Sequence, residues 1–418
     1  MPWKETHVEE QRQRFIEAFL EREAGWQMSQ LCDAFGISRK TGYKWVERFA
    51  DGGKKALIDQ SRARHTQDHA TSAQIIRAVV QLRRLHPSWG ARKLLEVLRT
   101  READKSWPAA STIGDILKRH ELIEPRRRRR RATPTAREDF RQAAVANDVW
   151  AADFKGWFRT RDGYRCDPLT ISDLSSRYLL ECRRVRKTNG AEVRKVFERV
   201  FREYGLPVAI RTDNGSPFAS VGLGGLSALS VWWVKLGIAL ERIEPGRPDQ
   251  NGRHERMHRT LKAETTRPAA ANASAQQRAF NRFRQSFNWE RPHEALGQAC
   301  PAEHYMPSER SYPSREPQME YAADVEVRRV RRSGDIKWRG GFVYLNEALI
   351  GEPVSLQEVS DRHWLIRFGP VKLALLDDAS GTLLRIQPAR TGAREARAAV
   401  ENSGRPSGSL RSPQPQND

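Results

Sequence analysis

Apolar residues recur at helical spacing through the N-terminal part of the chain. One helix is expected from Val8 to Arg22 and a short second helix from Ser29 to Ala34. Gly36 interrupts this pattern, and Ser38 can cap a third helix from Arg39 to Phe49. In the first helix the apolar residues at helical spacing are Phe15, Phe19 and Leu20. Leu31 and Phe35 are expected to face inward, and Tyr43, Val46 and Phe49 repeat every three residues in the third helix.

A short helix, a glycine turn and a capped second helix form the pattern of a helix-turn-helix. Basic side chains on the second of these helices would suit entry into a DNA groove. The residues expected to contact DNA are Arg39, Lys40, Thr41 and Lys44. The alternative is a small helical bundle whose basic face is solvated.

A similar helical unit follows, with helices expected from Ser72 to Leu85, from Trp89 to Leu98 and from Pro108 to His120. Six consecutive arginines, Arg126 to Arg131, come next and cannot pack against one another. We expect an extended linker that is either solvated or tracks DNA phosphates. The residues expected to contact phosphates are Arg126, Arg127 and Arg128.

The middle of the chain changes to a strand pattern. Strands are expected at Val149–Phe154, Leu169–Asp173, Tyr178–Val185, Val208–Thr212 and Ile238–Ile243. Amphipathic helices separate the later strands, and a further helix begins near Gly252. Three strands able to form a meander, followed by strands joined through helices, describe a mixed sheet of the ribonuclease-H type.

Short alternating segments between Val325 and Ile386 predict a small all-β barrel, and a polar composition from Ala389 predicts a disordered tail. The fold class is therefore multidomain α+β, with N-terminal helix-turn-helix units, a ribonuclease-H-like mixed-sheet core and a small C-terminal β-barrel. The expected parts are a helix-turn-helix domain (1–65), a second helix-turn-helix-like domain (66–125), a basic linker (126–140), the catalytic core (141–305), a linker (306–322), the barrel (323–388) and the tail (389–418).

The charge balance narrows the class of partner. The 418 residues include 73 Lys and Arg against 52 Asp and Glu, a formal net charge of +21, which suits DNA or RNA. No apolar run reaches the roughly 18 residues that a membrane helix needs, the start of the chain has no apolar leader, and the four cysteines show no CxxC spacing. We therefore expect a cytosolic nucleic-acid-handling protein rather than a membrane protein, a secreted miniprotein or a zinc finger.

Three acidic residues fall where such a sheet would bring them together. Asp153 lies at the end of the first expected strand, Asp213 directly follows the fourth, and Glu255 lies in the first turn of the helix that begins near Gly252. The first and fourth strands are neighbours in this fold, so the carboxylates would converge and repel one another unless cations neutralise them. Oxygen ligands suit Mg²⁺ or Mn²⁺, and two such ions about 4 Å apart can activate a nucleophile and stabilise the leaving oxygen of a phosphodiester.

The helix that carries Glu255 places basic residues beside it. At about 100° per residue, the residues that share its face are His258, Arg259 and Lys262. We expect Arg259 and Lys262 to hold DNA phosphates beside the acid. A solvated face stabilised by an i, i+4 pair between Glu255 and Arg259 would give the same pattern, but it does not explain the other two acids.

Five motifs, in this order along the chain, resemble those of the DDE transposases of bacterial insertion sequences, which share a retroviral-integrase-like catalytic core. They are Trp150–Lys155, Ile171–Tyr178, Arg211–Phe218, Gly246–Glu255 and Asn288–Leu296, and Gly36–Trp45 resembles the helix-turn-helix that often precedes this core. The resemblance implies that Asp153, Asp213 and Glu255 are the catalytic and metal-binding triad. It also implies that the protein acts as a multimer on DNA.

Two features depart from the family pattern. The family often has roughly 35 residues between the second Asp and the Glu, whereas 41 residues intervene between Asp213 and Glu255. We expect the glycine-rich stretch Val221–Leu226 to absorb the surplus as a surface loop. The chain also has no Cys pair for the N-terminal zinc domain of retroviral integrases, which fits the bacterial branch.

Other polar and aromatic residues have plainer interpretations. We expect Asp173 to be structural rather than an acid that supports the site. The histidines of the Glu255 helix could approach phosphate or metal, but we favour ordinary surface roles for them. Residues in the fifth motif are expected to pack after the core, and two tryptophans are expected to pack in or on the sheet rather than to stack on bases. These residues are His254, His258, Arg291, His293, Trp150 and Trp157.

Together these features predict a DNA transposase that depends on Mg²⁺ or Mn²⁺, with two ions expected. It would bind terminal inverted repeats, cleave a phosphodiester at each end and transfer the strand to target DNA. Its partners would be double-stranded DNA and further copies of the chain, with no membrane, at the nucleoid in the bacterial cytoplasm. One alternative is a non-catalytic DNA-binding regulator, but such a protein would gain nothing from three clustered carboxylates. Another is a nuclease that acts on RNA–DNA hybrids, but such an enzyme needs no domains that bind a specific DNA sequence.

Overall fold

The computed structural model describes residues 8–21, 27–59, 71–123, 140–244, 250 and 252–386. The chain divides into two compact units, Met1–Ser72 and Ala73–Asp418. The expected arginine linker, Arg126–Arg131, and the expected tail, residues 389–418, lie outside the described residues. None of the helices in the described ranges combines the length and apolar character needed to cross a bilayer.

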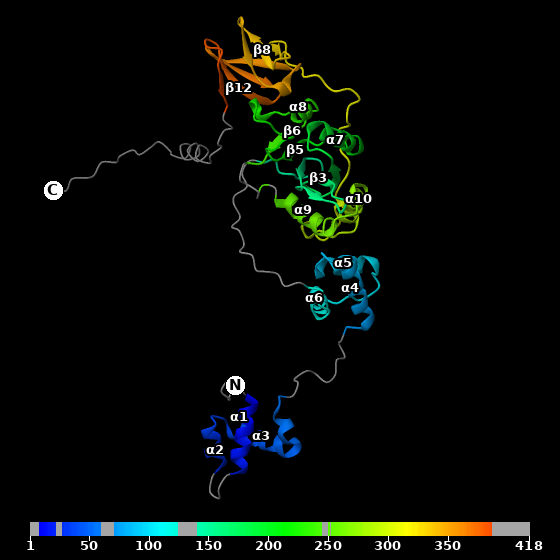
Figure 1. Ribbon diagram of the computed structural model, residues 1–418, viewed down its shortest axis with the longest axis vertical. Coiled ribbons are helices and arrows are strands. Elements are labelled where there is room, and N and C mark those ends of the chain that lie inside the picture. The colour runs from blue at the N-terminus through cyan, green and yellow to red at the C-terminus, as the bar shows by residue number, and fades with distance from the viewer. Residues whose placement is uncertain are drawn as a thin grey trace, which may run out of the picture. The chain divides into compact units, whose positions relative to one another are not determined.

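The first unit is a helical domain (blue in Figure 1) made of α1 (Val8–Leu20), α2 (Met28–Ala34) and α3 (Arg39–Gly52). Ser38 caps α3, because its hydroxyl accepts a hydrogen bond from the Thr41 N–H at 3.3 Å. Tyr43, the first residue of the three-residue repeat, is 60% exposed, and Trp45 is buried instead. Gly42 sets this register: a Cβ at this position would lie 2.5 Å from Cys32 Sγ, so α3 packs on α2 through its glycine.

The second unit begins with three helices, α4 (Ala73–Leu85), α5 (Ala91–Arg101) and α6 (Ala110–Arg119). They share a small apolar core to which each helix contributes, as Val79, Leu94 and Ile113 show. The helices match the second helical unit expected from the sequence.

A mixed sheet follows, made of β1 (Val149–Phe154), β2 (Phe158–Arg159), β3 (Arg165–Asp173), β4 (Leu179–Val185), β5 (Ala209–Thr212) and β6 (Ala239–Arg242). The strand order is β2-β3-β1-β5-β6, and β4 pairs with β3. β1 is antiparallel to β3 and parallel to β5, and β5 is parallel to β6. The expectation that the strand carrying Asp153 lies next to the strand before Asp213 is therefore confirmed.

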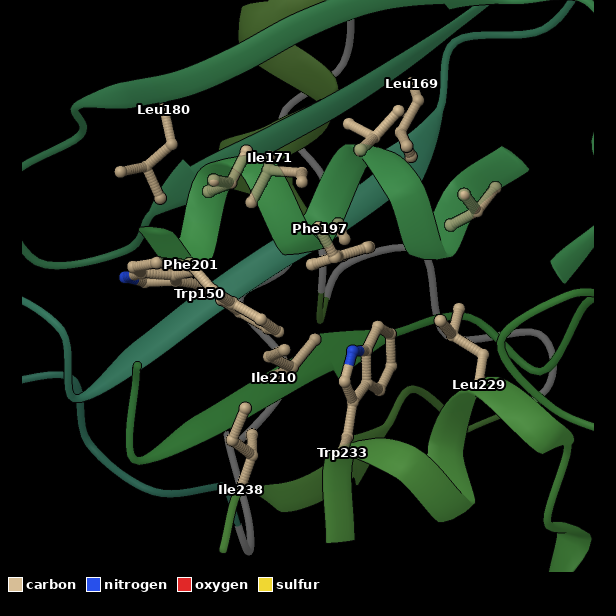
Figure 2. Close-up of a cluster of buried hydrophobic side chains, with 14 of the residues drawn as sticks. Trp150, Leu169, Ile171, Leu180, Phe197, Phe201, Ile210, Leu229, Trp233 and Ile238 are labelled. Atoms are coloured by element: carbon tan, nitrogen blue, oxygen red, sulfur yellow. The ribbon is translucent and has the colours of Figure 1, made fainter. Parts of the chain in front are cut away.

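Helices cover both faces of this sheet (green in Figure 1). On one face, α7 (Gly190–Tyr204) and α8 (Ala228–Lys235) pack on the strands through a core that includes Trp150, Phe197 and Trp233 (Figure 2). On the other face lie α9 (Gly252–Thr265) and α10 (Ala273–Trp289), whose Met257 and Phe280 share a core with the strands. Because side chains alternate along a strand, the residues between the buried apolar ones of β1 and β3 point at α9.

The C-terminal strands form an open sheet and a separate hairpin. The five-stranded order is β13-β12-β11-β10-β7, with no pairing between β13 and β7 among the described residues, and β8 pairs only with β9 there. The expected closed barrel is thus not borne out. The strands are β7 (Glu326–Arg329), β8 (Asp335–Trp338), β9 (Gly341–Tyr344), β10 (Pro353–Ser360), β11 (His363–Phe368), β12 (Val371–Asp377) and β13 (Leu383–Arg385).

Apolar residues near α8 of the mixed-sheet domain pack against the C-terminal strands. Because these residues bury part of the apolar face of the sheet, the sheet need not close on itself. Leu226 is fully buried and joins α8 residues in one apolar cluster with the C-terminal strands. Asn346 Nδ2 donates a hydrogen bond to the Leu226 carbonyl at 3.1 Å. The surplus stretch Val221–Leu226 is therefore a surface loop only at its start, where Val221 is 96% exposed, and it ends as a contact between the core and the C-terminal strands.

Candidate active site

Asp153 faces α9 because of the alternation along β1. Trp150 and Ala152 point into the core beneath α7 and α8, so the next side chain points to the opposite face. There Asp153 lies opposite Thr170 of β3 in the antiparallel ladder, and its side chain is 21% exposed. A carboxylate is thus held at the end of a buried strand, half covered by a helix.

Asp213 follows β5, whose parallel pairing with β1 brings the carboxyl ends of the two strands to one edge. The exposed Asp213 carboxylate accepts a hydrogen bond from the Gly215 N–H at 3.1 Å. Asn214 Nδ2 donates to the Ile243 carbonyl at 2.6 Å and so ties this turn to the end of β6. A Cβ at Gly215 would lie 3.2 Å from Asp213 Oδ2, so the close turn favours glycine.

Glu255 is exposed in the first turn of α9 and is the third predicted acid at this edge. Burial raises the pKa of Asp153 to about 7, with the charge of Asp213 as the second cause and that of Glu255 as a smaller one. The charges of Asp213 and Glu255 thus both reach Asp153, and carboxylate oxygens suit a hard divalent cation. Among the described residues, the group whose ligand atoms lie close enough to hold a metal ion is Asp153 with His254 and His258, within 4.8 Å of one another.

Two buried histidines lie beneath the carboxylates, and the prediction of surface roles for them is wrong. His254 and His258 are 1% and 5% exposed, because α9 presses this face against β3. The hydroxyl of Thr170 lies 2.7 Å from His254 Nε2 and 2.6 Å from His258 Nε2. Ser172 Oγ lies 3.0 Å from His254 Nδ1. Their i, i+4 spacing, in register with the apolar Leu261, is the sequence signal that could have found them.

The hydrogen bonds assign protons to this network. The Thr170 hydroxyl has a single proton. With that proton donated to the Asp153 carbonyl at 3.1 Å, both histidines donate to Thr170 from Nε2. His258 Nδ1 is then an unprotonated nitrogen, 3.8 Å from Asp153 Oδ2. Burial, mainly, lowers the pKa of His254 to about 3 and that of His258 to about 2, so both rings are neutral at pH 7.

The basic residues predicted to contact DNA fall in different places. Lys262 and Arg259 are both exposed on α9, but Arg259 lines a pocket together with Arg253 and Arg256 rather than standing only beside Glu255. Arg126, Arg127 and Arg128 lie outside the described residues.

On α3, the predicted groove-facing cations Arg39, Lys40 and Lys44 are exposed. Thr41 is only half exposed, because its hydroxyl hydrogen-bonds with Ser38 Oγ at 2.9 Å and takes part in the cap. The helix therefore presents a basic face to solvent, with Thr41 at its margin.

The structure agrees with some of the remaining predictions and differs from others. Asp173 is buried and accepts hydrogen bonds from the Asn147 and Ser176 N–H groups, which agrees with a structural role. Trp150 is fully buried as expected, but Trp157 is 57% exposed, with the guanidinium of Arg165 5.1 Å from its ring centroid.

Comparison with known protein families agrees with this geometry. Residues 143–248 and 236–301 each match a family described as an integrase core domain. Residues 143–301 are thus similar to an integrase core domain. Residues 6–58 and 41–117 match homeodomain-like domains, which precede it along the chain.

Two relatives of the chain come from bacterial insertion elements. The uncharacterized 31.7 kDa protein of insertion element IS407 from Burkholderia multivorans is 30% identical over 183 residues, or 44% of this chain and 64% of the relative. The uncharacterized 39.2 kDa protein of insertion element IS476 from Xanthomonas euvesicatoria is 27% identical over 252 residues, or 59% of this chain and 69% of the relative. The chain thus spans slightly less than two thirds of the first relative.

Two solved structures are also similar. The integrase catalytic core domain of HTLV-2, in complex with magnesium, is 16% identical and aligns over 39% of this chain and 100% of its own, with a TM-score of 0.32. The intasome of simian T-cell lymphotropic virus, in complex with PP2A regulatory subunit B56 gamma, is 16% identical over 75% of this chain and 100% of its own, with a TM-score of 0.35.

Proposed function

We propose that this protein is a DNA transposase that binds the terminal inverted repeats of an insertion element, cleaves a phosphodiester at each end and transfers the strand to target DNA. The observation that carries the proposal is that the charges of Asp213 and Glu255 both act on Asp153, within the region that matches an integrase core domain. The insertion-element relatives and the exposed basic face of α3 support it.

Asp153, Asp213 and Glu255 would hold two Mg²⁺ or Mn²⁺ ions. When bound, such ions activate an attacking oxygen and stabilise a leaving oxygen at phosphorus. The Thr170 hydroxyl, which contacts the Asp153 carbonyl and both histidines, would hold β1 against α9 and so position Asp153. Lys262, on the same edge of α9 as Glu255, would bind a DNA phosphate.

The reaction would run in two steps on the same edge of the sheet. Water attacks a phosphodiester at the element end and releases a 3′-hydroxyl. That hydroxyl then attacks a target phosphodiester, so one P–O bond forms as another breaks and the displaced 3′-oxygen leaves with a proton. Because the number of phosphodiester bonds is conserved in the second step, no ATP is needed.

DNA recognition would be divided between parts of the chain. Arg39, Lys40 and Lys44 of α3 would enter a groove of the repeats, and Arg126, Arg127 and Arg128 would follow phosphates between domains. Two element ends must be joined, so the active form would be a multimer on DNA, at the nucleoid of a bacterial cell.

Strand cleavage and joining tests this proposal. Purified protein would be incubated with labelled DNA from both flanks of its coding region, with Mg²⁺ or Mn²⁺, beside the Glu255→Gln variant. We expect nicks at one position in each flank and joined products, all lost in Glu255→Gln. Specific binding of the flanks without cutting, under both metals, would instead indicate a regulator.

A further inference from the structure

A pocket of about 330 Å³ lies beside α9 and does not include the proposed catalytic carboxylates. Its walls come from the turn between β3 and β4, from α9, from α5 and from the segment after α10. The α9 residues in its lining include Arg253 and Arg256 but not Glu255, His258 or Lys262. The helix therefore presents the acid on one flank and this pocket on the other.

The pocket lining is strongly basic. The basic residues among the described residues that form it are Lys93, Arg177, Arg253, Arg256, Arg259 and Arg291, and the acidic ones are Asp173 and Glu294. The basic side chains in the lining outnumber these two acids. Asp173 is buried and accepts hydrogen bonds from the Asn147 and Ser176 N–H groups, and Glu294 is exposed and pairs with Arg92 at 2.7 Å.

The cations act on one another. Burial, followed by the charge of Arg291, lowers the pKa of Lys93 to about 8. Burial, followed by the charges of Lys93 and Arg291, lowers the pKa of His293 to about 3. Arg291 is 9% exposed and has one ion pair, with Glu264 at 2.9 Å. An anion in the pocket would relieve this repulsion.

Arg177 occupies an unusual backbone conformation in this wall. Its φ is +68°, in the left-handed region that a glycine adopts more readily. A turn at this point needs no side chain, yet the chain places a guanidinium there, in the lining of the pocket. Glycine at this position would keep the turn and remove the charge.

We propose that this pocket binds a phosphate group through guanidinium groups that converge from the β3–β4 turn, α9 and the segment after α10. Guanidinium is suited to phosphate because its planar donors form paired, charge-assisted hydrogen bonds. Only the choice of DNA as the source of the phosphate rests on the proposed function. In that case a DNA strand would be held about one helix diameter, roughly 10 Å, from the carboxylate edge.

A DNA-binding assay without metal tests the basic pocket separately from catalysis. The affinity of the full-length protein for a labelled duplex would be measured at salt concentrations from about 50 to about 300 mM. Arg177→Gly and Arg256→Ala should each weaken binding several-fold and reduce the slope of log affinity against log salt by about 0.9, the value for one phosphate contact. The matched control is Arg278→Ala, which removes the same charge from an exposed position of α10 outside the pocket.

Inorganic phosphate distinguishes a DNA phosphate from a free phosphate as the ligand of the pocket. If the pocket holds a free phosphate, millimolar inorganic phosphate should raise the thermal unfolding midpoint of the wild type and not that of Arg177→Gly, while DNA affinity stays unchanged. Equal effects of all three substitutions on DNA binding, with no phosphate-dependent thermal shift, would overturn the proposal. Loss of strand cleavage in Glu255→Gln bears on the proposed function alone, because these binding measurements contain no metal.

Discussion

At the level of single residues, burial and the neighbouring carboxylates act on Asp153 in the same direction. Both favour its neutral form, so the pKa rises from the ordinary 3.8 to about 7. The folded protein therefore binds a proton that the unfolded chain has already released between about pH 4 and pH 7. The contribution of Asp153 to the stability of the metal-free protein should therefore fall as pH rises through this window and level off above it, whereas the lowered pKa values of His254 and His258 make their contributions rise with pH up to about 6.5.

Asp153→Asn should stabilise the metal-free protein at pH 8 and abolish strand cleavage. Each pKa unit corresponds to about 1.4 kcal/mol, so three units set an upper limit of about 4 kcal/mol at pH 8 and almost nothing at pH 4. Urea unfolding in the presence of a chelator, at both pH values, measures the difference. A variant that is less stable than the wild type at pH 8 would contradict this account of the site.

Thr170→Val tests the hydrogen-bond assignment. Valine has nearly the same shape but leaves the Nε2–H groups of two buried histidines without their acceptor. Each buried unsatisfied donor costs about 1 to 3 kcal/mol, so we expect a loss of about 2 kcal/mol or more in unfolding free energy. Thr170→Ser, which keeps the hydroxyl, is the control and should lose much less; equal losses would show that packing, not hydrogen bonding, matters here.

At the scale of elements, the stretch between β5 and α8 links the integrase core to the C-terminal strands. Leu226 fills an apolar cluster between them, and Lys235 of α8 pairs with Glu352 at 2.6 Å. An insertion that lengthens the interval between two active-site acids thus has a structural use, since its end supplies apolar cover for the C-terminal sheet.

Leu226→Ala should destabilise the second unit by about 2 to 4 kcal/mol, because truncating a buried leucine leaves a cavity. The C-terminal strands should also become more sensitive to limited proteolysis. Val221→Ala, in the same stretch but 96% exposed, should change neither property. Similar behaviour of the two variants would mean that this contact contributes little to stability.

At the scale of the whole molecule, the net charge of +21 is carried by parts with different expected roles. The exposed face of α3 belongs to the first compact unit, whereas the basic pocket belongs to the second. Base contacts specify a site and phosphate contacts position the protein, so the two regions should affect binding differently.

Lys44→Ala should weaken binding to the element ends by about 1 to 3 kcal/mol if the side chain reads a base, with little change for random duplex DNA. Competition between the two DNAs at constant salt measures that ratio. Arg14→Ala, an exposed cation on α1 paired with Glu10, is the control and should leave the ratio unchanged. Equal weakening of both DNAs by Lys44→Ala would place this residue on the phosphate backbone instead.

The sequence by itself determined the strands and helices, the neighbourhood of β1 and β5 and the order of the three acids. These follow from local periodicity and from the few ways in which strands joined by helices can pair. Asp153 could be assigned to the α9 face because alternation along a strand is strict. The capped basic helix α3 was equally visible, because Ser38 and its neighbours are local signals.

Only the tertiary structure decided which side of a helix meets which strand. The burial of His254 and His258 depends on how α9 crosses β3, and the inward turn of Trp45 in place of Tyr43 depends on the close approach of α3 at Gly42. The open C-terminal sheet and the basic pocket arise from segments far apart in sequence. The i, i+4 spacing of His254 and His258 with Leu261 indicates which face of α9 is buried. It does not indicate which strand this face meets, because crossing angles depend on contacts between segments far apart in sequence.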